Sequence, residues 1–530
     1  MPIPDPSEVQ PWYLRNINQA LALDEPSGNV YLRTYTTGAI ETATSKSAFG
    51  ENLAVTITPV VQLDAIYDLD PTKFETFTYG GGTAQSANSK FEVTAGSTAN
   101  SYGVIRSKKF IRYRPGQGCI ARFTAGFTAT DGVGPAGFTQ RAGFFNQEQA
   151  VQIGYDTNGK FGILRANGGK AQISQYTFTV FNDGSVVLQL NGVTFSSVTV
   201  AGGSIAANIA ALVAGLLAQP LFAALYTVEY DENDITFLAT SLGPQTGTNS
   251  ITGATATYSS LQSGVAQTEY WTYQEDWNID TLDGNGPSGA VLDTTKLNVY
   301  QINFRWLGAG ELRFAIENPL NGDMIFFHHI HYANQHTAPH LDNPSLKIGY
   351  VAANLTNPGS GSVSVIGSSM MGGIEGTVKT TTNPQAATGS RNDSMNSPGS
   401  VYHLLTIKNR LVYRNKINTR DLIIKTISAG VTATAAAPAT LYVYYSPTLP
   451  GNRLWQSMGE WNASYYATGQ FIITSLPQPI AVYQFASGSA LNTDISNLDI
   501  HIPPQGYITF AVSCTSNMNA ASAGVTFIED

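Results

Sequence analysis

The feature that most restricts the fold of this chain is an alternation of large apolar and polar residues that begins at Tyr300. Within 299–306 every second side chain is large and apolar, the period-two pattern of a strand with one buried face. A Gly-Ala-Gly turn separates this run from a second alternating run at 311–317. Asn-Pro and Asn-Gly pairs at 318–322 then precede a third strand over 324–332. The pattern predicts a β-meander with one polar face.

The composition also favours a chain built from many short strands. Charged residues make up 12% of the 530 residues, about half of the usual share, and small and hydroxyl-bearing residues take their place. A chain of this length exceeds a single core, so we expect a multidomain, all-β protein. The net charge is −9 with no basic block, which argues against a nucleic-acid partner because such partners need clustered Lys and Arg.

Turn spacing divides the chain into several units. Alternating segments fill 71–171 and again 269–376, with the rhythm of a β-sandwich in two halves. Residues 172–268 predict a small α+β domain inserted in a surface loop, where insertions are tolerated. Residues 377–400 almost lack large apolar side chains and predict a linker. Residues 401–530 alternate again and predict a C-terminal β-sandwich.

One helix is expected inside the insert. Ser204 is placed to cap it and Pro220 to end it. A hairpin over 226–244 follows, with a turn at 231–234. The apolar face of the helix would consist of Ile205, Ile209, Leu212, Val213, Leu216 and Leu217.

Residues 1–70 predict a docking segment. Pro11 could open a short helix that ends before Asp24, and the residues 29–38 suggest a strand. The expected helix carries Trp12, Ile17, Leu21 and Leu23 at helical spacing. A single helix and strand cannot bury a core, so the segment should dock on a partner subunit or on the chain's own body. Trp12, Ile17 and Leu21 are therefore the candidate assembly residues.

Six segments carry a resemblance to a known class of proteins. They are RYRPGQG (112–118), ARFTAGF (121–127), RAGFFN (141–146), FRWLGAG (304–310), ENPLNGDMIFFHHIHYAN (317–334) and LDNPSLKIGYVAANLTNPG (341–359). They resemble a domain of tailed-bacteriophage virion proteins of the tail, baseplate or fibre type, over roughly 75–376. The insert, by the order of its elements, resembles a small module that recurs in phage structural proteins.

The resemblance implies a fold and a role. The fold would be a lectin-like, concanavalin A-like or jelly-roll β-sandwich. The protein would be a non-enzymatic structural component of the virion, made in the host cytoplasm. Its partners would be other virion proteins and copies of itself, with a trimer favoured. A host-surface glycan or receptor-binding protein is the alternative, and capsid decoration or glycan depolymerisation comes after that.

Histidines are unusually clustered, because five of seven lie between 328 and 340. On a strand, His329 and His331 point to the same face and could form a metal pair. The acids considered near them are Asp323 and Asp342, and no cysteine is close. In the resembled family only the position of His329 is usually histidine. The sequence therefore favours structural histidines, no metal and no other cofactor, with His329 and His331 kept as candidates.

No pattern in the sequence predicts catalysis. The acidic sets at Asp276, Asp280 and Asp283 and at 229–234 fall on expected turns, where carboxylates usually bond backbone amides. The Gly-rich run 80–82 lacks the lysine and helix of a phosphate loop. Cys119 and Cys514 have no metal or redox neighbours and should be buried free thiols. We expect a protein that is not an enzyme.

A glycan-binding surface is a separate hypothesis. Exposed aromatic rings stack on sugars, although aromatic residues in strands are more often core or interface. The candidate contacts are Trp455, Trp461, Tyr465 and Tyr466, in a loop-rich region of the C-terminal unit. The longest apolar run, near 205–225, is broken by Gln219-Pro220, so no membrane span is expected.

Overall fold

The computed structural model describes residues 21–24, 29–32, 56–355, 361–377, 382–447, 455–469, 471–474 and 478–530. The chain divides into the units Met1–Thr56 and Ile57–Asp530. The nearly all-β, multidomain class predicted from the sequence is confirmed. Among the described residues, no helix is both long and apolar enough to cross a membrane.

The first unit contains a short antiparallel hairpin of β1 (Leu21–Asp24) and β2 (Asn29–Leu32), in which Leu21 pairs with Leu32. The expected helix is therefore wrong at its C-terminal end, because Leu21 and Leu23 lie in a strand. These two leucines fit a period of two as well as a helical spacing, and strand pairing satisfies their backbone groups. Trp12 and Ile17 lie outside the described residues.

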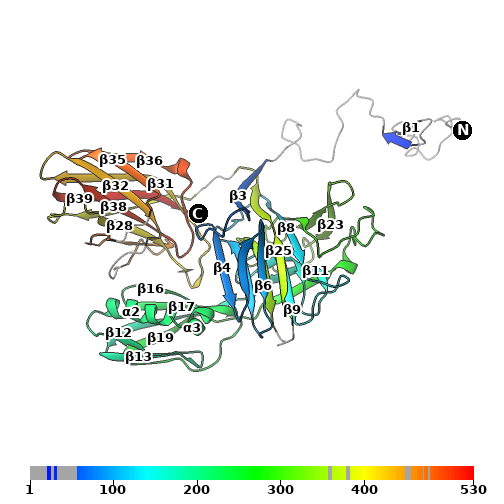
Figure 1. The fold of residues 1–530 in the computed structure, drawn as a ribbon, viewed down its shortest axis with the longest axis horizontal. Helices are drawn as coiled ribbons and strands as arrows, with labels where there is room; N and C mark the ends of the chain where they lie inside the picture. The colour runs from blue at the N-terminus through cyan, green and yellow to red at the C-terminus, as the bar shows by residue number, and fades with distance from the viewer. Residues whose placement is uncertain are drawn as a thin grey trace. The chain divides into compact units, whose positions relative to one another are not determined.

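Two sheets pack face to face in the first sandwich (Figure 1). Aromatic rings from both sheets meet between them: Phe144 and Phe304 lie edge to face with ring centroids 5.3 Å apart. One sheet runs in the order β20-β11-β10-β9-β24-β7-β4. Its strands are β4 (Phe74–Tyr79), β7 (Tyr102–Ser107), β9 (Phe138–Phe145), β10 (Ala150–Tyr155), β11 (Phe161–Asn167), β20 (Thr268–Tyr273) and β24 (Lys347–Asn354).

The other sheet runs β23-β22-β21-β8-β25-β6-β5, with β26 joining β8 to β3. Its first three strands are the predicted meander, which is confirmed by the antiparallel pairing of β22 with both neighbours. Strand β3 lies inside the expected docking segment 1–70 but pairs with β26, so that boundary is too late. The strands are β3 (Ile57–Asp64), β5 (Thr83–Ala87), β6 (Lys90–Ala95), β8 (Cys119–Phe127), β21 (Asn298–Phe304), β22 (Leu312–Glu317), β23 (Met324–Ile330), β25 (Val363–Gly367) and β26 (Ser369–Glu375).

An α+β region lies between β11 and β20 in sequence. It contains the sheet β16-β17-β12-β19, a small sheet around β13 and a separate apolar core. Helix α2 (Ile205–Leu217) buries Ile209, Leu212, Val213 and Leu216 as predicted. Its strands are β12 (Ala171–Phe181), β13 (Gly184–Leu190), β14 (Val193–Thr194), β15 (Val198–Val200), β16 (Tyr226–Tyr230), β17 (Asp234–Leu242), β18 (Ser250–Thr252) and β19 (Ala254–Gln262).

The ends of this helix differ from the sequence expectation. Ser204 occupies the N-cap position but makes no side-chain cap hydrogen bond, and Leu217 is 47% exposed. Pro220 ends α2 but also begins α3 (Pro220–Leu225), because proline suits the first turn of a helix.

A second sandwich has its own core. Its sheets run β27-β39-β31-β36, with β37 beside β31, and β33-β34-β28-β38-β32-β35. Strand β27 lies inside the predicted linker 377–400 and pairs with β39 along its whole length, so that part of the linker prediction is wrong. The strands are β27 (Pro384–Arg391), β28 (Tyr402–Asn409), β31 (Leu422–Ala433), β32 (Pro438–Tyr445), β33 (Gln456–Ser457), β34 (Ser464–Ala467), β35 (Ala481–Ala486), β36 (Ala490–Asp494), β37 (His501–Ile502), β38 (Tyr507–Cys514) and β39 (Met518–Glu529), besides the small hairpin of β29 (Val412–Tyr413) and β30 (Lys416–Ile417).

Small residues explain why β27 was missed. Its buried positions are Ala387 and Gly389, which fill the space against β28 without a large apolar side chain. The sequence signal for a strand depends on large apolar residues, so the sequence of β27 gives almost no such signal. Cys119 and Cys514 are buried and free, as predicted.

Candidate functional site

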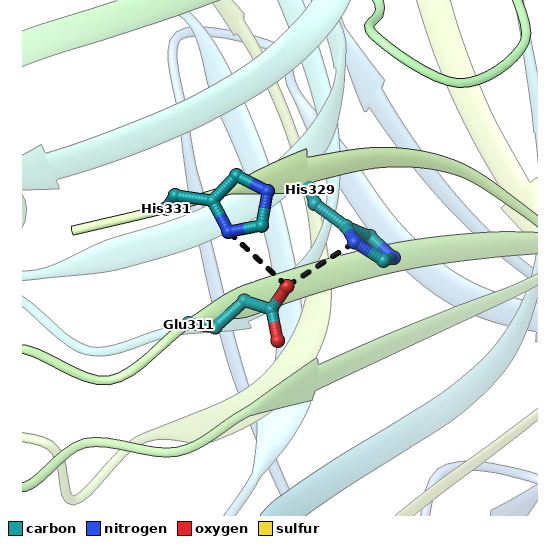
Figure 2. A group of neighbouring side chains, drawn as sticks. All are labelled: Glu311, His329 and His331. Carbon is teal, nitrogen blue, oxygen red and sulfur yellow. Dashed lines mark ion pairs between the residues drawn. The ribbon is translucent and has the colours of Figure 1, made fainter. Parts of the chain in front are cut away.

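The outer face of the meander brings a carboxylate and two imidazoles together. Glu311 directly precedes β22, His329 lies in β23, and His331 follows the end of β23. The strand register places His329 opposite Arg313, so their side chains share a face. Alternation turns Phe314 into the core and leaves Glu311 and Arg313 on the outside. Figure 2 shows both imidazole rings turned toward the carboxylate of Glu311.

The two oxygens of Glu311 have different partners. Oε1 lies 3.1 Å from Nδ1 of His329 and 3.4 Å from Nδ1 of His331. Oε2 accepts hydrogen bonds from Nη2 of Arg305 at 2.7 Å and from Nε of Arg313 at 2.6 Å. The carboxylate thus stands between a guanidinium side and an imidazole side.

These contacts set the charge states of the cluster. Burial alone would raise the pKa of Glu311, but the hydrogen bonds from Arg313 and Arg305 outweigh it and lower that pKa. The pKa of His329 is lowered, first by burial and then by Arg313 and His331, against the opposing pull of Glu311. Glu311 is therefore a carboxylate at neutral pH, and His329 favours the neutral form.

Two neighbouring histidines have structural roles. His328 is buried, and its Nδ1 accepts the N–H of Asn278 at 3.2 Å. Burial lowers the pKa of His328 to about 4, which keeps that nitrogen free to accept. His340 is fully buried, and burial lowers its pKa to about 4 as well. The expectation of structural histidines describes these two well.

A pocket of about 310 Å³ adjoins the cluster on the same face. A row of side-chain hydrogen bonds leads to it: Arg122 donates to Gln301 at 2.6 Å, Gln301 to Asn303 at 2.6 Å, and Asn303 to Glu375 at 3.2 Å. The face can therefore hold a small charged species against several fixed polar groups. The pocket is lined by Asn303, Phe304, Arg305, Glu311, Arg313, Phe326 and Glu375.

The sequence indicated His329 and His331 but missed Glu311. Asp323 and Asp342 are close to the histidines in sequence, whereas Glu311 lies just before β22, on the other side of the hairpin turn. The missing signal was the register: Glu311 and Arg313 alternate onto the polar face of β22, and the turn at 318–322 places β23 directly beside them.

The acidic residues of the expected turns have local structural tasks. Asp280 accepts the backbone N–H groups of Leu282 and Ser288, both at 2.9 Å. Asp283 accepts the N–H of Asn285 at 2.9 Å, and this bond lowers its pKa. Asp276 closes a short 3-10 helix (Gln274–Asp276). Glu229 does not lie at a hairpin tip as expected; it is buried within β16.

The aromatic candidates do not form one exposed surface. Trp455 and Tyr465 are buried and pack with Ala467. Tyr466 is half-buried against the core of the second sandwich. Trp461 is 67% exposed, and the guanidinium of Arg414 lies 3.5 Å from its ring centroid. Of the four, Trp461 offers the most ring surface to a ligand.

Comparisons with known proteins leave the family open. No protein-family model matches the chain, and no curated protein matches it. Among solved structures, a legume lectin-like domain from Entamoeba histolytica is 9% identical, with 58% of this chain and 97% of that one covered and a TM-score of 0.22. Peanut lectin with a nine-residue peptide is 10% identical, with 62% and 100% covered and a TM-score of 0.25. At these TM-scores we draw no functional argument from either likeness.

Proposed function

We propose that this protein is a non-enzymatic structural component of a tailed-phage virion, of the tail, baseplate or fibre type, and assembles with copies of itself. The observation that carries the assembly part is a set of sheet edges without charged protection. The virion part rests on the resemblance of the six sequence segments, the two longest of which include β23 and β24.

Edge strands normally need protection against pairing with other chains. Proteins supply it with lysines, prolines or bulges. Strand β35 ends one sheet of the second sandwich with the uncharged sequence AVYQFA, and β19 ends a sheet of the α+β region with ATATYSSLQ. Val482 in β35 is 48% exposed. Neutral edges of this kind, whose outer side no described strand pairs with, suit a chain whose edges are covered by other copies.

A lysine at the edge tests the assembly part. We expect Val482→Lys to lower the oligomeric state of the full chain, measured by light scattering after gel filtration, while the circular dichroism spectrum is unchanged. Leu217→Lys is the matched control: Leu217 is 47% exposed but lies in helix α2 and not in a strand. A wild type that is monomeric at high concentration, or equal effects of both lysines, would count against assembly through β35.

The virion part is tested on particles. If the proposal holds, mass spectrometry of purified phage from a host that carries the gene should find this chain in a fixed ratio to the other structural proteins. A chain that is abundant in the lysate and missing from washed particles would rule the proposal out.

Receptor binding is the second candidate, favoured by the exposed ring of Trp461. On a glycan array, binding by the wild type that is lost in Trp461→Ala, with no sugar released, would support it. No binding by the wild type leaves the structural role alone, and sugar release would instead indicate an enzyme.

A further inference from the structure

We propose that Glu311, His329 and His331 form a binding site for one divalent cation of the zinc class. The ligand atoms would be Oε1 of Glu311 and Nδ1 of each histidine. This site is independent of the proposed virion role, and neither one requires the other.

The spacing of the three atoms fits a tetrahedral ion. Zinc binds imidazole nitrogen and carboxylate oxygen at about 2.0–2.2 Å, so two ligand atoms in a tetrahedral shell lie about 3.3 Å apart. Oε1 of Glu311 lies 3.1 Å and 3.4 Å from the two Nδ1 atoms. All three ligand atoms lie within 4.8 Å of one another. A small closing movement of the histidines around one ion completes three of four positions.

The surroundings hold the carboxylate in the required orientation. Arg305 and Arg313 both donate to Oε2, which leaves Oε1 free for the ion. Hydrogen bonds to the second oxygen of a ligating carboxylate are a common outer shell of metal sites, because they fix its orientation. The positive charge of the guanidiniums opposes a cation, but it is concentrated at the oxygen that the ion does not use.

The donor set selects the class of ion. Two imidazoles and one carboxylate suit zinc, cobalt or nickel, whereas calcium and magnesium require oxygen ligands. The side chain of His331 is 63% exposed, so water can reach the fourth position. A bound ion would fasten the terminal strand β23 to the start of β22, at the end of the sheet.

The test is metal binding by the full chain after treatment with a chelator. We expect isothermal titration with zinc to show one site per chain, and cobalt to give the visible absorption of a tetrahedral complex. His331→Ala should weaken zinc binding by about 100-fold or more, since changes in outer-shell partners alone cost roughly 10–100-fold. The melting temperature of the wild type should rise with zinc and that of His331→Ala should not.

His336→Ala is the matched control. His336 is an exposed histidine near the cluster that stacks on Tyr332 and belongs to no ligand set. It should bind zinc like the wild type. Glu311→Gln, checked for folding by circular dichroism, should lose binding as His331→Ala does. The proposal is overturned if the wild type takes up no zinc, if His331→Ala binds as tightly as the wild type, or if His336→Ala loses binding equally.

Discussion

At the residue scale, Glu75 is a carboxylate shared by two cations beside the first core. Glu75 accepts from Lys347 at 2.7 Å and from Arg106 at 2.8 Å, and the Lys347 side chain is only 5% exposed. Burial would raise the pKa of Glu75, but the charges of Lys347 and Arg106 outweigh it and lower the pKa to about 2. Burial lowers the pKa of Lys347 to about 8, so both groups of the pair are charged in the folded protein from about pH 2 to about pH 8.

Removing the carboxylate of Glu75 should lower the free energy of unfolding. We expect Glu75→Gln to destabilise the protein by about 3 kcal/mol at pH 7, because it leaves the buried charge of Lys347 with no carboxylate. Glu317→Gln, at an exposed position of β22, should stay within about 0.5 kcal/mol. Urea unfolding of the three proteins measures both differences.

The difference in unfolding free energy between the wild type and Glu75→Gln should depend on pH in a definite direction. The pKa of Glu75 is depressed in the folded state, so its stabilisation is complete above the ordinary value of 4.5 and is lost as the pH falls toward 2. The gap in unfolding free energy between the wild type and Glu75→Gln should therefore shrink from pH 5 to pH 2. A gap that is constant with pH would show that the ion pair is not what stabilises this site.

Contacts between single residues on different strands are the part of the candidate site that the sequence does not predict. His329 and His331 can be identified because they are two residues apart in the strand expected over 324–332. Glu311 cannot, because its nearness depends on the register between β22 and β23, which shifts between Phe314 and Ala315. Contacts across strands need the register first, and a shift by one residue would have moved Glu311 to the core face.

At the scale of elements, alternation predicted the strands that carry large apolar residues and failed where the buried residues are small. The meander of β21, β22 and β23 was predicted almost to its ends. The sequence of β27 predicts a linker because its core-facing positions are Ala387 and Gly389. The expected N-terminal helix was wrong for a different reason. The spacing of Leu21 and Leu23 fits the period of two of a strand as well as the period of a helix.

A methyl group added to β27 should show that it is a core strand. A Cβ at Gly389 would lie 2.3 Å from the backbone oxygen of Leu404 in β28. We expect Gly389→Ala to lower stability by about 1–3 kcal/mol, the range for overpacking a tight interior. Gly361→Ala is the control, because nothing lies within 4 Å of its Cβ position. Thermal melting that is unchanged in Gly389→Ala would restore the linker interpretation.

At the scale of the whole molecule, the question is how independent the α+β region is. Its two ends are held together where Lys170 and Val265 exchange backbone hydrogen bonds of 2.9 Å in each direction, and Glu148 of the first sandwich accepts the N–H of Ala171 at 3.1 Å. Within the unit Ile57–Asp530, it also contacts the second sandwich. Glu229 lies 3.2 Å from Nζ of Lys408 and accepts the N–H of Leu411 at 3.1 Å, with both charged side chains largely buried. The sequence predicted an insertion but could not predict this contact, because the partners are about 180 residues apart.

Deletion of the α+β region should affect the two sandwiches differently. Replacing 171–264 with Asn-Gly should close a tight hairpin between Lys170 and Val265, which already form a hydrogen-bonded pair. The first sandwich should keep its β spectrum and a cooperative melt, because its core includes no residue from the removed segment. The second sandwich should be less stable, because Leu411 and Val412 lose their apolar cover. If the first sandwich is also unfolded in the deletion, the α+β region supplies something essential to it and is not a separable insertion.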